Sequence, residues 1–183
     1  MSLQDHFRQA VNVSQEIKNQ ATDLYTLFNK QYAESRGFKY RGITCHTSSF
    51  AVLRNVEDTG KMKPMALLKM VYNLLGSWTI PLQHLAKEVG SLQGAPAALL
   101  SKAQEIEKPH KGLLEGVRKL IRRSGDTENV KYLTWSGLTC LQSTYEETLL
   151  FGFYKLFYCL HEDSVKVSTN LKLLEDKMVT YNC

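Results

Sequence analysis

The sequence predicts an all-α protein in which four long helices form an up-up-down-down bundle with two long crossover connections. Apolar residues recur every three or four positions in four separate stretches, which is the period of one helical face. The first and third connections between these stretches are long, whereas the second is short. With 183 residues, 43% of them hydrophobic and 22% charged, the chain has the size and composition of one globular domain spanning residues 1–183.

The first helix is predicted over residues 3–34. Its inner face consists of positions at steps of three and four, namely Leu3, Phe7, Ala10, Ser14, Ile17, Ala21, Leu24, Phe28 and Tyr32. The pattern ends at Ser35-Arg36-Gly37, and glycine and hydroxyl residues then interrupt any regular period until Pro64. We therefore expect a first crossover without regular structure.

The second helix is predicted over residues 64–90, because proline suits the first position of a helix. Its apolar face consists of Met65, Leu68, Val71, Leu75, Trp78, Leu82, Leu85 and Val89. Pro81 lies in the middle of this pattern and has no backbone N–H to donate. We expect it to bend the helix locally without ending it.

The third helix is predicted over residues 97–123, after a short break rich in glycine and proline. Pro109 lies inside it with Gly112 one turn later, so we expect a kink there. The fourth helix is predicted over residues 145–178 and would be about 50 Å long at 1.5 Å per residue.

The lengths of the connections determine the predicted topology. A short link forces neighbouring helices to be antiparallel, whereas a link as long as a helix permits parallel neighbours. The long first link, short second link and long third link therefore favour the up-up-down-down arrangement of growth hormones and cytokines.

The charge and the apolar patterns exclude several classes of protein. The net charge of +5 is spread along the chain without a basic tail, so we expect no nucleic-acid partner. Lys155 and Glu162 interrupt the longest apolar helix, which argues against membrane insertion. The first residues lack the basic and apolar blocks of a signal peptide, so secretion would require that a leader had been removed.

Catalytic and metal sites have little support in the sequence. Glu107 and His110 form a single Glu-x-x-His, but di-iron bundles need two copies and two further glutamates. The charged run from His161 to Asp163 is interpreted as a solvated helix face, since it has no nucleophile or metal spacing. Histidines such as His46 or His161 are either zinc ligands or ordinary surface residues, and we favour the second interpretation. We expect no enzyme activity, no cofactor and no metal.

Seven segments in chain order resemble the prolactin family. The most specific are residues 45–49, which read Cys-His-Thr-Ser-Ser, and residues 77–82, which read Ser-Trp-Thr-Ile-Pro-Leu. The others are residues 95–107, 113–116, 135–138, 159–166 and 171–174. Residues 45–49 make the chain more similar to prolactin, or to a prolactin-like or placental lactogen relative, than to growth hormone.

This resemblance implies a long-chain helical cytokine that is secreted, monomeric and bound by two ectodomains of a prolactin-type class I cytokine receptor. Dimerised receptors would then start kinase signalling inside the cell. Two alternatives remain open, namely a prolactin-like decoy that binds without signalling and a ligand of a growth-hormone-type receptor.

The resemblance also implies two receptor faces. The first face would lie on helices one and four with the first crossover, and its candidate residues are Gln15, Lys18, Tyr154, Lys166 and Lys172. The second face would lie on helices one and three around Gly116. A glycine inside a helix costs about 1 kcal/mol relative to alanine, so Gly116 requires a reason. That reason is either the approach of a receptor or close packing against a neighbouring helix.

Gln15, Lys18 and Val165 take the places of histidines that prolactins often have, so receptor binding is expected to depend little on pH. Asn12 begins an Asn-Val-Ser sequon and is a candidate glycosylation site.

The resemblance implies a disulfide between Cys45 and Cys159. Cys183 matches the terminal cysteine of the family, but Asp176 stands where its usual partner is expected. Bridged Cα atoms lie within about 7 Å, and the fourth helix would separate Cys140 from Cys183 by much more. We therefore expect Cys140 and Cys183 to be free or bridged between molecules.

Overall fold

The computed structural model describes residues 1–180 of the chain, with side chains to residue 178. The first long helix is α1 (Leu3–Phe28), which continues through a π-helical segment (Asn29–Ala33) and a 3-10 turn (Glu34–Arg36). Ser2 caps α1, because its side chain accepts from the N–H of Asp5 while the Asp5 carboxylate accepts from the N–H of Ser2. Gly37 ends the segment with a φ of 67°, a conformation that favours glycine.

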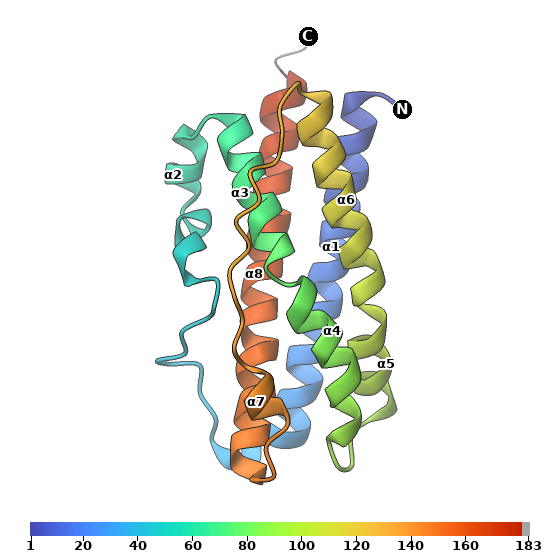
Figure 1. Cartoon of the computed structure of the whole chain (residues 1–183), viewed down its shortest axis with the longest axis vertical. Helices are drawn as coiled ribbons and strands as arrows, with labels where there is room; N and C mark the ends of the chain where they lie inside the picture. The colour runs from blue at the N-terminus through green and yellow to red at the C-terminus, as the bar shows by residue number, and fades with distance from the viewer. Residues whose placement is uncertain (181–183) are drawn as a thin grey trace.

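Each of the other long helices was predicted close to where it lies. The second consists of α3 (Pro64–Gly76) and α4 (Thr79–Glu88), and the third of α5 (Ala97–Glu105) and α6 (Glu107–Arg123). The fourth is α8 (Glu146–Thr180). Figure 1 shows the N-terminus and the end of α8 at the same end of the bundle, with α1 and α3 running away from it and α6 and α8 running towards it. The predicted up-up-down-down bundle is therefore confirmed.

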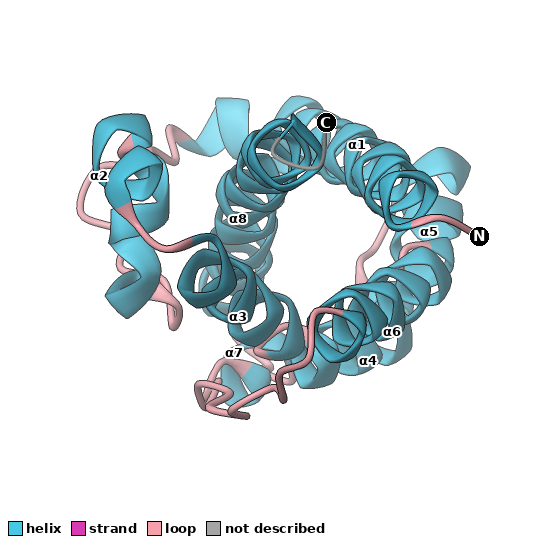
Figure 2. Ribbon diagram, turned by 90° about the horizontal axis from the view of Figure 1, so that it is seen from above, coloured by secondary structure: helices cyan, strands magenta, loops and turns pink. Residues whose placement is uncertain are grey.

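The four long helices surround one core. Seen end-on in Figure 2, α1 and α3 lie opposite each other, and each packs against both α6 and α8. The largest side chains in this core with almost no exposure include Phe7, Phe28, Tyr72, Phe153 and Phe157. Among the described residues, no helix combines the length and the apolar character needed to cross a membrane.

The expectation of an irregular first crossover was wrong. A 3-10 helix (Ser48–Arg54) and the short helix α2 (Val56–Lys61) occupy its second half. The side chain of Asn55 caps α2 by accepting from the N–H groups of Glu57 and Asp58. Leu53 is buried, so this part of the crossover packs against the bundle. The second crossover also contains one helical turn, α7 (Leu138–Leu141).

Pro81 does more than bend the second helix, so this prediction also needs correction. The α-helix stops at Gly76 and restarts at Thr79. Because Pro81 has no N–H, the carbonyl of Ser77, four residues earlier, loses its helical donor. The Nε2 of His46 donates to this carbonyl at 2.9 Å, and the Nε2 of His110 donates to the carbonyl of Leu75 at 2.7 Å. Two histidines from distant segments thus donate hydrogen bonds to backbone carbonyl groups at the break.

The predicted kink in the third helix is present at Ile106, between α5 and α6. Pro109 lies three residues later, where it removes the donor that the carbonyl of Glu105 would otherwise receive.

The second crossover is held along α3 by side chains of that helix and of its C-cap residue, Ser77. Asn73 accepts from the N–H of Lys131 and donates to the carbonyl of Asn129, and Ser77 accepts from the N–H of Leu133. The ring of Tyr132 lies directly over Gly76, where a Cβ would be 1.9 Å from its Cε1 atom. Gly76 therefore makes room for the crossover.

Candidate functional site

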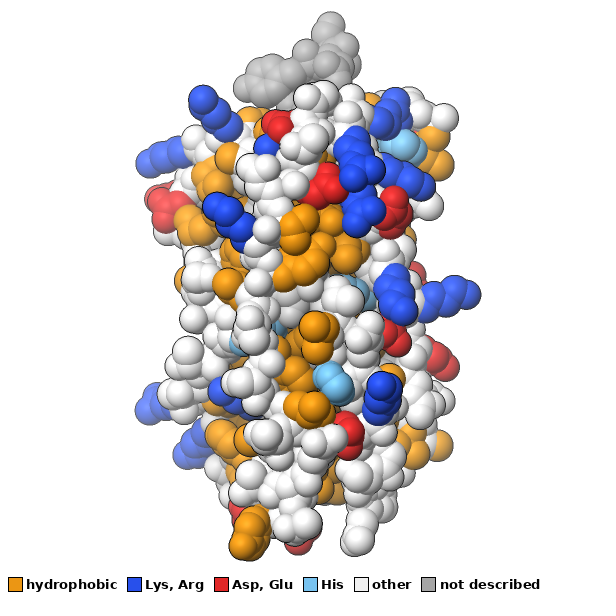
Figure 3. All heavy atoms as spheres, viewed as in Figure 1, with side chains coloured by type: hydrophobic (Ala, Val, Ile, Leu, Met, Phe, Trp, Pro, Cys, Tyr) orange, Lys and Arg blue, Asp and Glu red, His pale blue; other side chains and the backbone are white. Residues whose placement is uncertain are grey.

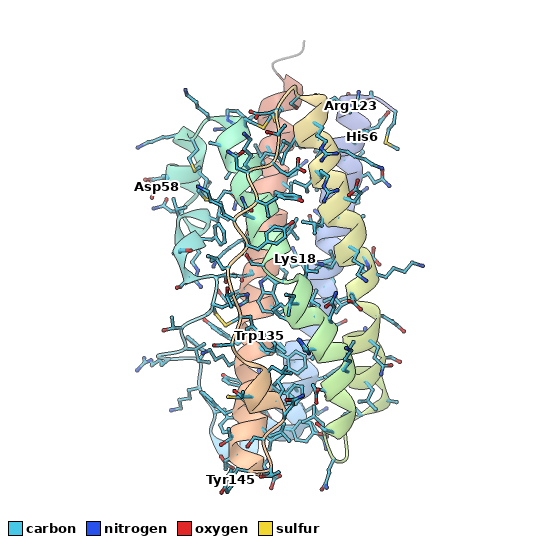
Figure 4. All side chains as sticks on the ribbon, in the orientation of Figure 1. His6, Lys18, Asp58, Arg123, Trp135 and Tyr145 are labelled. Carbon is cyan, nitrogen blue, oxygen red and sulfur yellow. A yellow bond between two sulfur atoms is a disulfide. The ribbon has the colours of Figure 1, made fainter. Side chains whose placement is uncertain are left out.

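The first candidate face lies along α1 and α8, and three of its predicted residues are accessible there. Gln15 is exposed and Lys18 is partly exposed on α1, and Figure 4 places Lys18 near mid-height of the bundle. Lys172 is exposed on α8, where its Nζ lies 2.8 Å from a carboxylate oxygen of Glu175 and 3.7 Å from one of Asp176. Asp176, which replaces the expected cysteine, is thus an ion-pair partner of Lys172.

The other two predicted residues of this face are buried. Tyr154 is 3% exposed and Lys166 is 6% exposed, so neither side chain offers an accessible surface in this structure. The hydroxyl of Tyr154 lies 3.3 Å from that of Tyr25 on α1. Burial and this hydrogen bond raise the pKa of Tyr154, so its hydroxyl stays protonated. Both residues can support the face from beneath.

Aromatic side chains form the exposed surface above Tyr154. Tyr40 from the first crossover stacks on Tyr158 of α8 with ring centroids 5.5 Å apart, and Phe38 meets Phe151 edge to face at 5.4 Å. Tyr40 is 57% exposed and Phe151 is 40% exposed. The periodicity of the fourth helix gave no indication of this surface, because half of it comes from the crossover.

Asp163 is the centre of a buried polar cluster, so its interpretation as part of a solvated face was wrong. It is 2% exposed. One carboxylate oxygen accepts from the hydroxyl of Thr47 and from the indole Nε1 of Trp78, and the other accepts from the Nζ of Lys166 at 3.0 Å. These partners offset the cost of burying the carboxylate. Asn170, one turn beyond Lys166, donates to the carbonyl of Leu53 at 2.8 Å. The cluster fixes the first crossover against α8.

The predicted disulfide between Cys45 and Cys159 is confirmed, with Cα atoms 5.7 Å apart. It joins the first crossover to the middle of α8, close to the cluster around Asp163. Cys140 forms no disulfide within the described part of the chain, whereas Cys183 lies outside the described residues.

The second candidate face contains a hollow of about 1010 Å³ between α1 and the third long helix. Gly112 and Gly116 lie one turn apart in its wall, and a Cβ on either would have no neighbouring atom within 4 Å. Close helix packing therefore does not explain Gly116. Pro109 also lines the hollow, so the kink borders this face.

The remaining predicted positions are the candidate glycosylation site and two of the histidines considered for metal binding. Asn12 is exposed on α1, but the Ser14 of its sequon is 1% exposed and donates to the carbonyl of Val11 at 2.7 Å. Glycosylation of Asn12 stays a prediction. His110 of the Glu-x-x-His is buried, with its Nε2 already bound to the Leu75 carbonyl. His46 was expected at the surface but is largely covered, because it fills the break in the second helix.

Comparison with known proteins assigns this arrangement to a family. The model of the somatotropin hormone family matches residues 1–183. Prolactin-2A1 from Mus musculus is 38% identical over 184 aligned positions, which cover 99% of this chain and 81% of that protein. The bundle, the disulfide and these matches agree, and the chain belongs to the somatotropin hormone family.

Proposed function

We propose that this hormone is secreted and binds two ectodomains of a prolactin-type class I cytokine receptor, one on each candidate face. The bound receptors would start kinase signalling inside the cell. The observation that supports this proposal most is the open hollow at Gly116, because a mid-helix glycine with no packing neighbour has no structural reason to be there. A receptor side chain entering the hollow supplies that reason.

The first receptor would contact α1, α8 and the first crossover. Gln15, Lys18 and Lys172 are the accessible candidates for direct contact. Tyr154 and Lys166 are proposed as positioning residues, since burial leaves them little surface with which to touch a partner. Replacing Lys18 and Lys172 together by alanine should weaken binding of the first receptor. Lys111→Ala removes an exposed lysine of α6 and serves as a control.

Weak dependence of receptor binding on pH remains part of the proposal. Gln15 and Lys18 stand where a histidine would titrate near neutral pH, and the exposed Val165 is apolar. One histidine is nonetheless close to the first face, since the ring of His161 stacks on Tyr25 at 5.7 Å. Affinity for the receptor should stay constant from pH 8 to pH 6, and a steep loss of affinity would contradict this part of the proposal.

A decoy that binds one receptor without signalling is the second candidate. The burial of Tyr154 and Lys166 favours it, because a first face without these contacts is weaker. A titration of the hormone with prolactin receptor ectodomains, followed by light scattering, separates the two functions. A complex with two ectodomains supports the agonist, one ectodomain supports the decoy, and no binding contradicts both. The same titration with growth hormone receptor ectodomains tests the remaining alternative.

A further inference from the structure

A run of basic residues occupies the outer side of α6 near its end. Residues 118–123 read Arg-Lys-Leu-Ile-Arg-Arg, and the two apolar residues between the basic pairs, Leu120 and Ile121, are fully buried. Since these two face the core, Arg118, Lys119, Arg122 and Arg123 must project from the opposite side of the helix. We call these four residues the basic face of α6.

Two members of the basic face are held in place by carboxylates. The Nε of Arg118 lies 3.5 Å from an oxygen of Glu128, and the Nη2 of Arg122 lies 2.9 Å from the same oxygen. The side chain of Glu128 is only 10% exposed, so it orders the two guanidinium groups from below. The Nη2 of Arg118 also donates to the hydroxyl of Tyr72 at 3.5 Å, whereas the side chain of Arg122 is 60% exposed. Arg118 also pairs with Glu115 at 3.3 Å.

The other two members of the basic face, Lys119 and Arg123, have no ion pair with Asp or Glu within residues 1–178. The Nη1 of Arg123 instead donates to two neutral acceptors, the carbonyl of Met1 and the Nδ1 of His6 at 2.9 Å. Figure 4 shows Arg123 and His6 side by side at one end of the bundle, and in Figure 3 Lys and Arg side chains gather over that corner beside a histidine. Among the described side chains, no carboxylate therefore forms an ion pair with Lys119 or Arg123.

His6 lies within reach of these positive charges. Loss of solvent around its ring lowers the pKa of His6. The charges of Arg123, the N-terminal ammonium and Lys119 lower it further, whereas the Asp5 carboxylate opposes them. An anion bound at this corner would counter these positive charges.

We propose that the basic face of α6 binds sulfated glycosaminoglycan chains. Guanidinium groups form strong hydrogen bonds with tetrahedral oxyanions, which suits the exposed Arg122 and Arg123 beside Lys119. The four side chains lie along an exposed helix rather than in a closed pocket, and this shape fits a linear polyanion better than a small anion. The choice of a glycan among polyanions rests on the proposed secretion, because sulfated polysaccharides are the polyanions of the extracellular space.

The basic face also borders the hollow at Gly116. Lys119 belongs to the basic face and lines this hollow together with His6. A glycan chain bound to Lys119 would therefore lie at the edge of the second receptor face.

The test is chromatography on immobilised heparin with a sodium chloride gradient, in the absence of any receptor. The wild-type chain should remain bound at 0.15 M salt, a physiological ionic strength. The double variant Lys119→Gln with Arg123→Gln removes the two unpaired cations. It should bind heparin oligosaccharide about 10- to 30-fold more weakly, and the slope of log K against log salt should fall by about one to two.

A matched control removes the same charge from another surface. Lys39 and Arg41 are exposed in the first crossover, and Lys39→Gln with Arg41→Gln should leave heparin affinity close to that of the wild type. Circular dichroism melts should show that both double variants keep the fold.

Three results would overturn the proposal. They are elution of the wild type below 0.15 M salt, equal losses of affinity in both double variants, and equally tight binding of the wild type to phosphatidylserine vesicles or duplex DNA. None of these results depends on receptor binding, so the proposed hormone function is tested separately.

Discussion

The indole Nε1 of Trp78 donates to a carboxylate oxygen of Asp163 at 2.8 Å, and this bond joins the break in the second long helix to the middle of α8. Asp163 also accepts from Thr47 of the first crossover and from Lys166. One buried carboxylate therefore holds together two long helices and the crossover that covers them, directly beneath the first candidate face.

Asp163→Ala should destabilise the protein by about 3 to 5 kcal/mol, because it leaves the ammonium group of Lys166 buried without its partner. The indole of Trp78 and the hydroxyl of Thr47 lose their acceptor as well. Urea unfolding at pH 7 measures the loss.

The double variant Asp163→Leu with Lys166→Met is the control for this prediction. It replaces both charges by apolar groups of similar size, so it should be more stable than Asp163→Ala. If the two variants are equally unstable, the ion pair is not the source of the loss.

Gly76→Ala should destabilise the protein by about 1 to 3 kcal/mol. The new Cβ would overlap the ring of Tyr132, which must move and give up its 3.0 Å hydrogen bond to the hydroxyl of Tyr72. In a Tyr132→Ala background the overlap disappears, and the same substitution should then be neutral or stabilising. Denaturation of the wild type, the two single variants and the double variant gives the coupling free energy between positions 76 and 132. A coupling near zero would contradict the predicted contact.

Gly116→Ala should have the opposite effect and stabilise the protein by about 0.5 to 1 kcal/mol. This glycine also lies inside a helix, but its Cβ would meet no atom within 4 Å, so only the gain in helix propensity remains. A thermal melt of the variant measures the change, and a loss of stability would mean that the hollow closes in solution.

Stability should fall as the pH drops below about 6.5, the ordinary pKa of histidine. Burial lowers the pKa values of His110 and His46 in the folded state, so below that pH the unfolded chain binds more protons than the folded one. As the pH falls, each histidine then lowers the free energy of unfolding by up to about 1.4 kcal/mol per pH unit.

His110→Gln removes one of these two contributions. Urea unfolding at pH 7.5 and pH 5.5 should show a smaller difference for the variant than for the wild type. An unchanged difference would mean that His110 is not the buried neutral group that the structure places beside Leu75.

Local patterns in the sequence predicted the long helices well, because these depend on neighbouring residues. The step of three and four residues located the four helices, and Gly37 and Pro109 located an end and a kink. The break at Ser77 was missed, because its carbonyl is satisfied by His46, which is 31 residues away in the sequence.

The candidate site was predicted less completely than the fold, for the same reason. The sequence places three residues at positions that would be exposed on an amphipathic helix, namely Asp163, Lys166 and Tyr154. In the structure all three are buried, because the first crossover or α1 covers them. Gly76 and Gly116 are equivalent in the sequence, and only the tertiary structure shows that one is packed and the other open.

The most direct test of two separate receptor faces is the mass of the receptor complex formed by Gly116→Arg, measured beside Gly116→Ala. Arginine fills the hollow, so Gly116→Arg should bind one ectodomain with wild-type affinity and should not signal. Gly116→Ala leaves most of the hollow open and should still bind two ectodomains. If Gly116→Arg also binds two and signals fully, the second receptor does not use this face and the proposed mechanism is wrong.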